Sequence, residues 1–218
     1  VSPERSLLAW TRHLLQVSGV LTKAVVQSFS PYDWEAHVAA LSRMEELGYV
    51  TRGLFVRGVH ALQFAAKDTV ERLREPIVAD AGRPIDAVLL SAANPANPYG
   101  LVLDWPADAN ANADAPAGGF ARKPGNYLLL QDGRFVMWAA NNGRKIDVID
   151  PEAAADPSLQ AEYVRFTARC LLRERGQRKV VIDSWNGRPI ARTELGERLA
   201  ALGAEKDGGS CVIWPSSV

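Results

Sequence analysis

The sequence is poor in the residues that build metal centres and disulfide frameworks. Its 218 residues include two cysteines and three histidines, and no group of them has the spacing of metal ligands. Cys170 and Cys211 lie in apolar helix-like and strand-like settings, which favours buried free thiols in a reducing compartment over a disulfide. His13, His37 and His60 all lie in the first third of the chain. We therefore expect no metal ion here.

Motifs of several enzyme classes are also missing. The chain has no GxxxxGK[ST] loop, so we do not expect it to bind and split a nucleoside triphosphate in that manner. It also lacks a G-x-S-x-G elbow and an HExxH helix. No apolar run approaches the roughly 18 residues of a membrane span, and the N-terminus lacks the layout of a signal peptide. A cytoplasmic protein is predicted, and because the first residue is Val1 rather than Met, we expect a fragment of a longer chain or a processed form.

Charge of neither sign is in excess. Lysine and arginine number 25, aspartate and glutamate also 25, and the formal net charge is zero. Such a balance gives no bulk attraction to nucleic acid or to an anionic membrane, so any such binding needs a local basic face. With 47% apolar residues, the chain is long enough for one large or two small domains with real cores.

The first 76 residues show the order of elements of a winged helix. Ser2 and Pro3 open a helix, Thr22 precedes a brief second one, and a third runs from "SPYDW" to a cap at Gly48 with Trp34, Val38, Leu41, Met44 and Leu47 along one face. Two short strands, 49–56 and 61–65, then flank a turn at residues 57–60, and a last helix spans residues 68–74. Three helices followed by a β-hairpin indicate a winged-helix domain at residues 1–76.

Residues 77–218 have the texture of a second, β-rich domain. Strands are expected at residues 86–90, 100–103, 127–131, 134–139 and 145–149, with hairpin turns at Asp132-Gly133 and Asn142-Gly143. A helix at 157–176, a strand before an Asn-Gly turn, a helix capped by Thr193 and a closing strand follow. The fold class is therefore α+β: a winged helix, then a β-rich, barrel-like domain with late helices. Residues 107–119 lack apolar periodicity and are expected to form a mobile surface insertion.

A loop with two Asn-Pro pairs, "NPANPYG" at residues 94–100, separates two of these strands. Each proline fixes its own backbone and pushes the preceding asparagine towards extended geometry, so the segment is neither helix nor central strand. We expect a rigid corner between the two domains, with Tyr99 packed against one of them and Gly100 allowing a turn. A corner that faces DNA is the alternative.

Candidate DNA contacts lie on both domains. The third helix presents Arg43 outward together with Asp33, Glu35, His37 and Ser42, and its acidic groups would repel phosphates, so a protein-packing role is at least as well supported. The hairpin is a better candidate. The predicted nucleic-acid contacts are Lys23, Arg43, Arg52, Arg57, His60, Arg122 and Lys123, with Trp105 and Trp185 beside turns as possible stacking platforms for bases. A solvated charged face and ordinary core tryptophans are the plainer interpretations.

Several carboxylates at strand ends and loops are of the type that activates water. Asp104, Asp147, Asp183 and Asp207 occupy such positions, but none has a sequence partner that distinguishes it from a turn or cap aspartate. Pattern alone does not show catalysis.

Longer stretches resemble a known family. The run "LSRMEELGYVTRGLFVRGVHALQFAAKDTVERLRE", the loop "NPANPYG" and the segment "GNYLLLQDGRFVMWAANNGRKI" are similar to the C-terminal region of bacterial Lhr proteins, the large helicase-related ATPases. The resemblance covers roughly residues 41–190. It implies a piece of a long DNA-translocating enzyme whose motor, with its ATP and Mg²⁺, lies upstream, so no cofactor is expected in this piece.

That region of the family is in turn similar in architecture to winged-helix DNA glycosylases of the AlkZ type. The similarity implies DNA, in particular single-stranded DNA, as partner, and removal of a flipped-out base such as uracil. The glutamine motif of those enzymes has no counterpart that we can place here, since Gln63 lies in the hairpin, and Asp207 and Asp183 are the nominated catalytic carboxylates. The alternative is a non-catalytic packing or oligomerisation module that holds several motors together.

Overall fold

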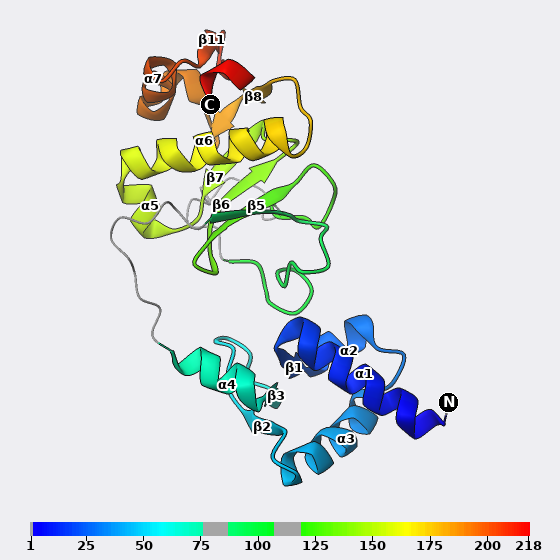
Figure 1. Ribbon diagram of the computed structural model, residues 1–218. Helices are drawn as coiled ribbons and strands as arrows, with labels where there is room; N and C mark the ends of the chain where they lie inside the picture. The colour runs from blue at the N-terminus through cyan, green and yellow to red at the C-terminus, as the bar shows by residue number, and fades with distance from the viewer. Residues whose placement is uncertain (1, 76–86, 107–118) are drawn as a thin grey trace. The chain divides into compact units, whose positions relative to one another are not determined.

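The computed structural model describes residues 2–75, 87–106 and 119–218, and the chain divides into two compact units (Figure 1). The first unit comprises Val1–Ala81 and Pro98–Asp104, and the second comprises Gly82–Asn97 and Trp105–Val218. The predicted domain boundary between Pro76 and Ile77 lies outside the described residues. So do residues 107–118 of the tract 107–119, for which a mobile insertion was predicted.

Side-chain caps set the starts of the helices in the first unit. The elements are α1 (Pro3–Ser18), β1 (Val20–Thr22), α2 (Lys23–Phe29) and α3 (Trp34–Glu46). The Ser2 hydroxyl accepts a hydrogen bond from the Arg5 amide, and Thr22 does the same for Val25, as the sequence predicts. Asp33, rather than the Ser-Pro pair before it, caps α3 by accepting from the Ala36 amide at 2.7 Å.

A small sheet completes the winged helix. β2 (Val50–Gly53) and β3 (Gln63–Ala66) form an antiparallel pair, β1 adds on the other side of β3, and α4 (Lys67–Arg74) follows. The wing strands are shorter than predicted, so residues 54–62 form a long loop. The buried core of the unit consists of Leu14, Leu15, Leu21, Val25, Val26, Leu41, Val50 and Phe64.

Two expectations for α3 are wrong. Leu47 is 72% exposed, because α3 ends at Glu46 and Leu47, as the C-cap residue, does not continue the apolar face of the helix. His37 points inward and is fully buried, with Nδ1 2.8 Å from the Thr11 hydroxyl and Nε2 2.7 Å from that of Ser30. Since Thr11 donates its proton to the Leu7 carbonyl, it accepts from Nδ1, and Nε2 accepts from Ser30. Burial lowers the pKa of His37, which favours this neutral form.

The second unit is built on two open sheets. The larger has the order β10-β9-β7-β6-β5-β4 and the smaller β11-β12-β8. The strands are β4 (Ala87–Ser91), β5 (Tyr127–Gln131), β6 (Arg134–Ala140), β7 (Lys145–Val148), β8 (Val180–Ile182), β9 (Ser184–Trp185), β10 (Arg188–Pro189), β11 (Glu205–Asp207) and β12 (Ser210–Ile213). The α+β class is confirmed, but in the part of the chain that the structure describes neither sheet closes, so a barrel-like domain is not observed.

Residues 100–103, predicted as a strand, form a turn with one isolated bridge from Tyr99 to Leu103.

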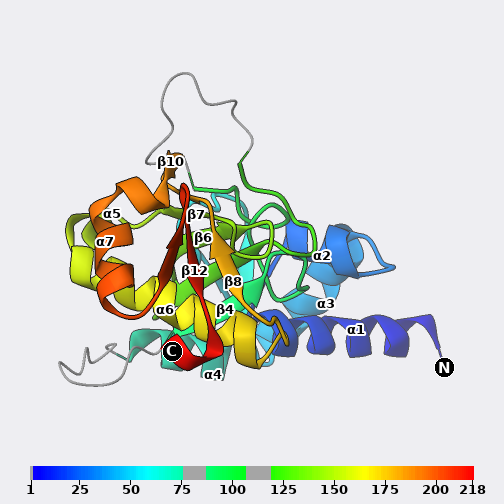
Figure 2. The ribbon, with the colours of Figure 1, turned by 90° about the horizontal axis from the view of Figure 1, so that it is seen from above.

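Late helices pack on the sheets of this unit, and the last of them lies against the smaller sheet (Figure 1). They are α5 (Pro151–Ala155), α6 (Pro157–Arg173) and α7 (Glu194–Ala201), with short 3-10 turns η1 (Ile190–Arg192) and η2 (Pro215–Ser217). Figures 1 and 2 show α6, in yellow, running beside strands of the larger sheet. Tyr163, Val164, Ala168 and Leu171 of α6 share a buried core with Leu129, Met137, Ile146 and Val148 of the sheet.

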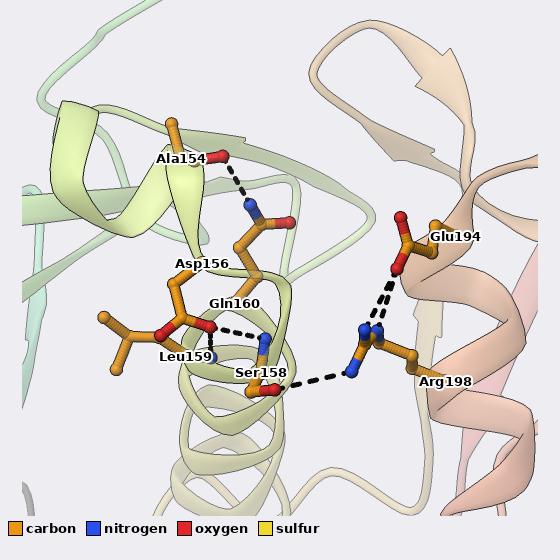
Figure 3. A network of polar contacts seen from close by, with 7 residues as sticks. All are labelled: Ala154, Asp156, Ser158, Leu159, Gln160, Glu194 and Arg198. Atoms are coloured by element: carbon orange, nitrogen blue, oxygen red, sulfur yellow. Dashed lines mark hydrogen bonds and ion pairs between the residues drawn. The ribbon is translucent and has the colours of Figure 1, made fainter.

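Polar contacts fix the elbow where α5 turns into α6 (Figure 3). Asp156 accepts from the Ser158 and Leu159 amides at 2.8 and 3.2 Å, so it caps α6. Gln160 donates to the Ala154 carbonyl of α5 at 2.8 Å. On α7, Arg198 pairs with Glu194 at 3.0 Å and reaches the Ser158 hydroxyl at 3.4 Å, which links α7 to α6.

An irregularity in β6 gathers aromatic rings on the face opposite α6. The pairing register shifts between Leu129 and Leu130, so Val136 is an extra residue and Phe135 and Trp138 project to the same side. Trp105 and Phe120 cover them. The centroids of these two stacked rings are 5.4 Å apart, and they lie 5.5 Å (Trp105) and 5.3 Å (Phe120) from the centroid of the Trp138 ring. Trp138 is only 1% exposed.

Candidate nucleic-acid interface

One buried side chain shapes the loop of the wing. Gln63, the first residue of β3, is fully buried, and its Oε1 accepts from the Phe55 and Val56 amides at 2.9 Å each. Its Nε2 donates to the Val59 carbonyl at 2.6 Å. The residues that follow β2 therefore find their hydrogen-bond partner in a side chain rather than in a β-ladder, and loop 54–62 has a defined shape.

The basic residues of this wing differ in their pairing. Arg57 and His60 lie exposed on the loop, and neither forms an ion pair with any residue that the structure describes. Arg52 on β2 instead pairs with Glu45 of α3, Nε to Oε2 at 2.6 Å, and its backbone amide donates to the same carboxylate. The hydrogen bond from Arg52 lowers the pKa of Glu45, so the carboxylate stays ionised. Arg57 and His60 are thus better placed than Arg52 to contact a phosphate.

The surface of α3 is acidic. Asp33, Glu35, Glu45 and Glu46 lie on or next to it, against the single exposed cation Arg43. Lys23, at the start of α2, is exposed. Because carboxylates outnumber the one exposed arginine of α3, this helix is a poor match to a phosphate-lined groove, and the wing is the stronger candidate within the first unit.

Arg122 stabilises the loop with the two Asn-Pro pairs. Its guanidinium donates to the Asn97 carbonyl at 2.5 Å and to the Asn94 carbonyl at 3.1 Å, and the buried Asn97 side chain donates to the Ala92 carbonyl. Arg122 is therefore occupied within the protein, whereas the adjacent Lys123 is exposed. The chain passes from the second unit to the first between Asn97 and Pro98, in the middle of this loop. Gly100 has a φ of 71°, the conformation for which a glycine was expected.

The two tryptophans proposed as stacking platforms are both engaged in packing. Trp185 on β9 is 6% exposed and belongs to the main core. Trp105 is half-buried, with one face stacked on Phe120. Little ring surface is left for an unpaired base at Trp185.

Asp183 and Asp207 both neighbour Ser210 of β12. Asp207 pairs with Ser210 in the β11–β12 register, and directly paired residues project to the same face. The Ser210 hydroxyl donates to Asp183 Oδ1 at 2.8 Å, and Arg144 Nε donates to Oδ2 at 2.7 Å. The hydrogen bonds from Arg144 and then Ser210 lower the pKa of Asp183 and hold it as an anion. Asp207 is exposed at the start of the Gly208-Gly209 turn.

A run of cations at the end of α6 was not singled out from the sequence. Arg173, Arg175, Arg178 and Lys179 are all exposed. The only sign of them in the sequence is that four basic residues lie within seven positions. Cations at a helix C-terminus are common because they complement the helix dipole, so this pattern alone does not indicate a binding site.

The described residues contain no group of three or more His, Cys, Asp or Glu side chains that could hold a metal ion. Cys170 and Cys211 are both buried free thiols, and burial raises the pKa of Cys170 to about 11. Within residues 2–75, 87–106 and 119–218, no helix is long and apolar enough to cross a membrane.

Comparison with known proteins gives the family. Residues 1–84 match the family model described as large helicase-related protein, winged-helix domain. A Mycolicibacterium smegmatis protein named "Lhr helicase/ probable uracil glycosylase" is 35% identical over 85% of this chain and 13% of its own length. An Escherichia coli protein named "Lhr helicase/uracil glycosylase" is 27% identical over 87% of this chain and 12% of its own length. The chain thus spans a small part of each relative, and it belongs to the large helicase-related (Lhr) family.

Proposed function

We propose that this chain is a DNA-binding module from the C-terminal region of an Lhr-type helicase, and that the wing of its first unit contacts the phosphate backbone. The observation that carries the proposal is the pair of exposed side chains that can donate hydrogen bonds to a phosphate, Arg57 and His60, on a loop whose shape Gln63 fixes. A preformed loop loses little conformational entropy on binding. The partners are single-stranded DNA and the upstream domains of the same chain, and ATP and Mg²⁺ act only at the motor.

Replacing Arg57 by Gln is expected to weaken DNA binding and to flatten its salt dependence. Each lost phosphate contact reduces the slope of log K against log salt by about 0.7 for single strands and about 0.9 for duplex. The measurement is fluorescence anisotropy of a labelled oligonucleotide over a series of salt concentrations. Arg52→Gln is the matched control on the same wing: since Glu45 already pairs with Arg52, we expect a smaller change.

Two outcomes would count against this proposal. An equal loss from both variants would mean that the unpaired charge of Arg57 is not what binds. Absence of any DNA binding by the unsubstituted chain at low salt would favour the packing or oligomerisation module, for which the exposed Leu47, Tyr49 and Leu54 would supply apolar surface.

Base excision is the second candidate function. Both relatives carry uracil glycosylase in their names, and Ser210 pairs with Asp207 in the β11–β12 register and donates a hydrogen bond to Asp183. A carboxylate that remains ionised can position water or stabilise the sugar cation left when a flipped base departs. Asp207 has the accessibility for this role, and Asp183 has the fixed negative charge.

The test uses single-stranded DNA with one deoxyuridine, followed by alkali and a sequencing gel. We expect cleavage at the uracil, and a reduction of at least about a hundredfold in Asp207→Asn or Asp183→Asn, as for loss of a group that acts in the transition state. Asp132→Asn, in an exposed turn, is the control. Thermal unfolding of each variant identifies loss through instability, which concerns Asp183 because it binds Arg144. No cleavage by the unsubstituted chain, or equal cleavage by all variants, would reject this function for these residues.

A further inference from the structure

Three loops that are distant in sequence meet at one end of the second unit. The Asn142 amide of the β6–β7 turn donates to the Gly125 carbonyl at 2.6 Å. A Cβ placed on Gly143 would lie 2.9 Å from Leu171 Cδ1 of α6 and 3.3 Å from Val180 Cγ1 of β8. The turn at residues 123–126, the turn at 141–145 and the α6–β8 loop at 173–179 therefore lie side by side.

Seven of the eight charged residues in these loops are cations, and one of the seven, Arg144, is paired with Asp183. Lys123, Lys145, Arg173, Arg175, Arg178 and Lys179 are all exposed, and we call them the basic edge. None of the six forms an ion pair with another residue that the structure describes. Glu174 is the single acidic residue in the three segments, in a chain whose overall formal charge is zero.

Helix stabilisation accounts for little of this charge. The helix dipole favours a cation in the last turn, and Arg173 fills that position. The others lie beyond the helix or on different loops. The Arg175 guanidinium lies 5.9 Å from the centre of the Tyr127 ring, and the Lys179 ammonium lies 5.3 Å from the centre of the Trp214 ring. These cation–π contacts hold both exposed charges in place.

The chemistry of the basic edge fits a chain of phosphates. Arginine presents paired N–H donors that match phosphate oxygens, and three of the six cations are arginines. Insertion into a lipid surface would require exposed apolar side chains, and none of the exposed large hydrophobic residues among those described belongs to these segments.

We propose that the basic edge binds the phosphate backbone of a nucleic-acid strand, as a second contact on a different unit from the wing. The inference rests on the proposed DNA-binding function, and it adds a separate surface with its own residues.

The test is a charge-neutralising triple variant, Arg173→Gln, Arg175→Gln and Arg178→Gln, in the whole chain. We expect at least about a tenfold loss of affinity for a labelled 20-nucleotide single strand at ~0.1 M salt, and a salt slope reduced in size by about 2. Arg12→Gln, Arg188→Gln and Arg192→Gln together form the matched control, because they change the net charge equally at exposed sites outside the three loops. An equal loss in the control would overturn the inference, since net charge alone would then explain the binding.

Failure of this inference can be told from failure of the wing proposal. If Arg57→Gln weakens binding and the triple variant does not, the basic edge is rejected and the wing stands. If the triple variant weakens binding and Arg57→Gln does not, the basic edge is supported and the wing is rejected. Co-sedimentation with phosphatidylserine vesicles tests the other polyanion: loss of vesicle binding with DNA binding unchanged would overturn the inference.

Discussion

Replacement of Gln63 by Met is expected to lower the free energy of unfolding of the first unit by about 3 kcal/mol and to release the wing. The methionine side chain is nearly as long as that of glutamine and is apolar, so it can stay buried. It cannot accept from the Phe55 and Val56 amides or donate to the Val59 carbonyl. An unsatisfied buried backbone group costs about 1–3 kcal/mol, and rehydration of the exposed side of the loop limits the total. Urea unfolding measures the loss.

Two further measurements make the Gln63 prediction specific. The amides of Phe55 and Val56 should exchange with solvent at least about tenfold faster in the Met variant, because each loses its acceptor. Gln63→Glu is the control that keeps an acceptor for both amides while losing the donor to Val59, so it should retain most of the protection of the two amides. Unchanged exchange in Gln63→Met would show that the side chain does not hold the loop.

The substitution Trp138→Ala is expected to destabilise the second unit by about 3–5 kcal/mol, the range for truncation of a buried aromatic side chain. Trp138 is 1% exposed and makes edge contacts with Trp105, Phe120 and Phe135, so its loss leaves a cavity that rigid rings cannot refill. The check is urea unfolding followed by far-UV circular dichroism. Trp105→Ala, at a half-buried position of the same cluster, should cost clearly less; equal losses would mean that the cluster does not depend on burial of Trp138.

Local chemistry made part of the fold predictable. A hydroxyl before a helix pairs with an amide three residues on, so Ser2 and Thr22 marked helix starts without any knowledge of the tertiary structure. Asn142 and Gly143 both adopt the positive φ that a tight hairpin needs, and the sequence predicted the turn for that reason. In each case the determining contact lies within a few residues.

Features that depend on distant residues were not predictable in this way. His37 lies on an exposed-looking face by helical periodicity, yet it is buried because Thr11 of α1 and Ser30 supply partners for both ring nitrogens. The extra residue in β6 changes which side chains share a face, and strict alternation cannot reveal it. Closure of a sheet depends on strand pairing across the whole domain, so the expectation of a barrel had no local basis.

The candidate interface shows the same division. Sequence identified the cations of the wing, but pairing through space separates Arg52, held by Glu45, from Arg57, which has no acidic partner among the described residues. Trp185 and Trp105 are beside turns as predicted, and only their packing shows that Trp185 is buried and that Phe120 covers one face of Trp105. The basic edge draws on three segments, so no single stretch of sequence displays it.

The division of the chain into units has a consequence for dissecting the protein. The backbone crosses from one unit to the other three times, after Ala81, after Asn97 and after Asp104. A single protease cut after Asn97 or after Asp104 therefore leaves the two units joined by covalent bonds, and a cut after Ala81 leaves Pro98–Asp104 of the first unit attached to the second. A truncation at residue 84 would also strip the first unit of Pro98–Asp104, including Val102, which packs against its core. Expression of either unit by itself therefore requires a gene that joins its two separate segments, with a short designed linker in place of the intervening residues of the other unit.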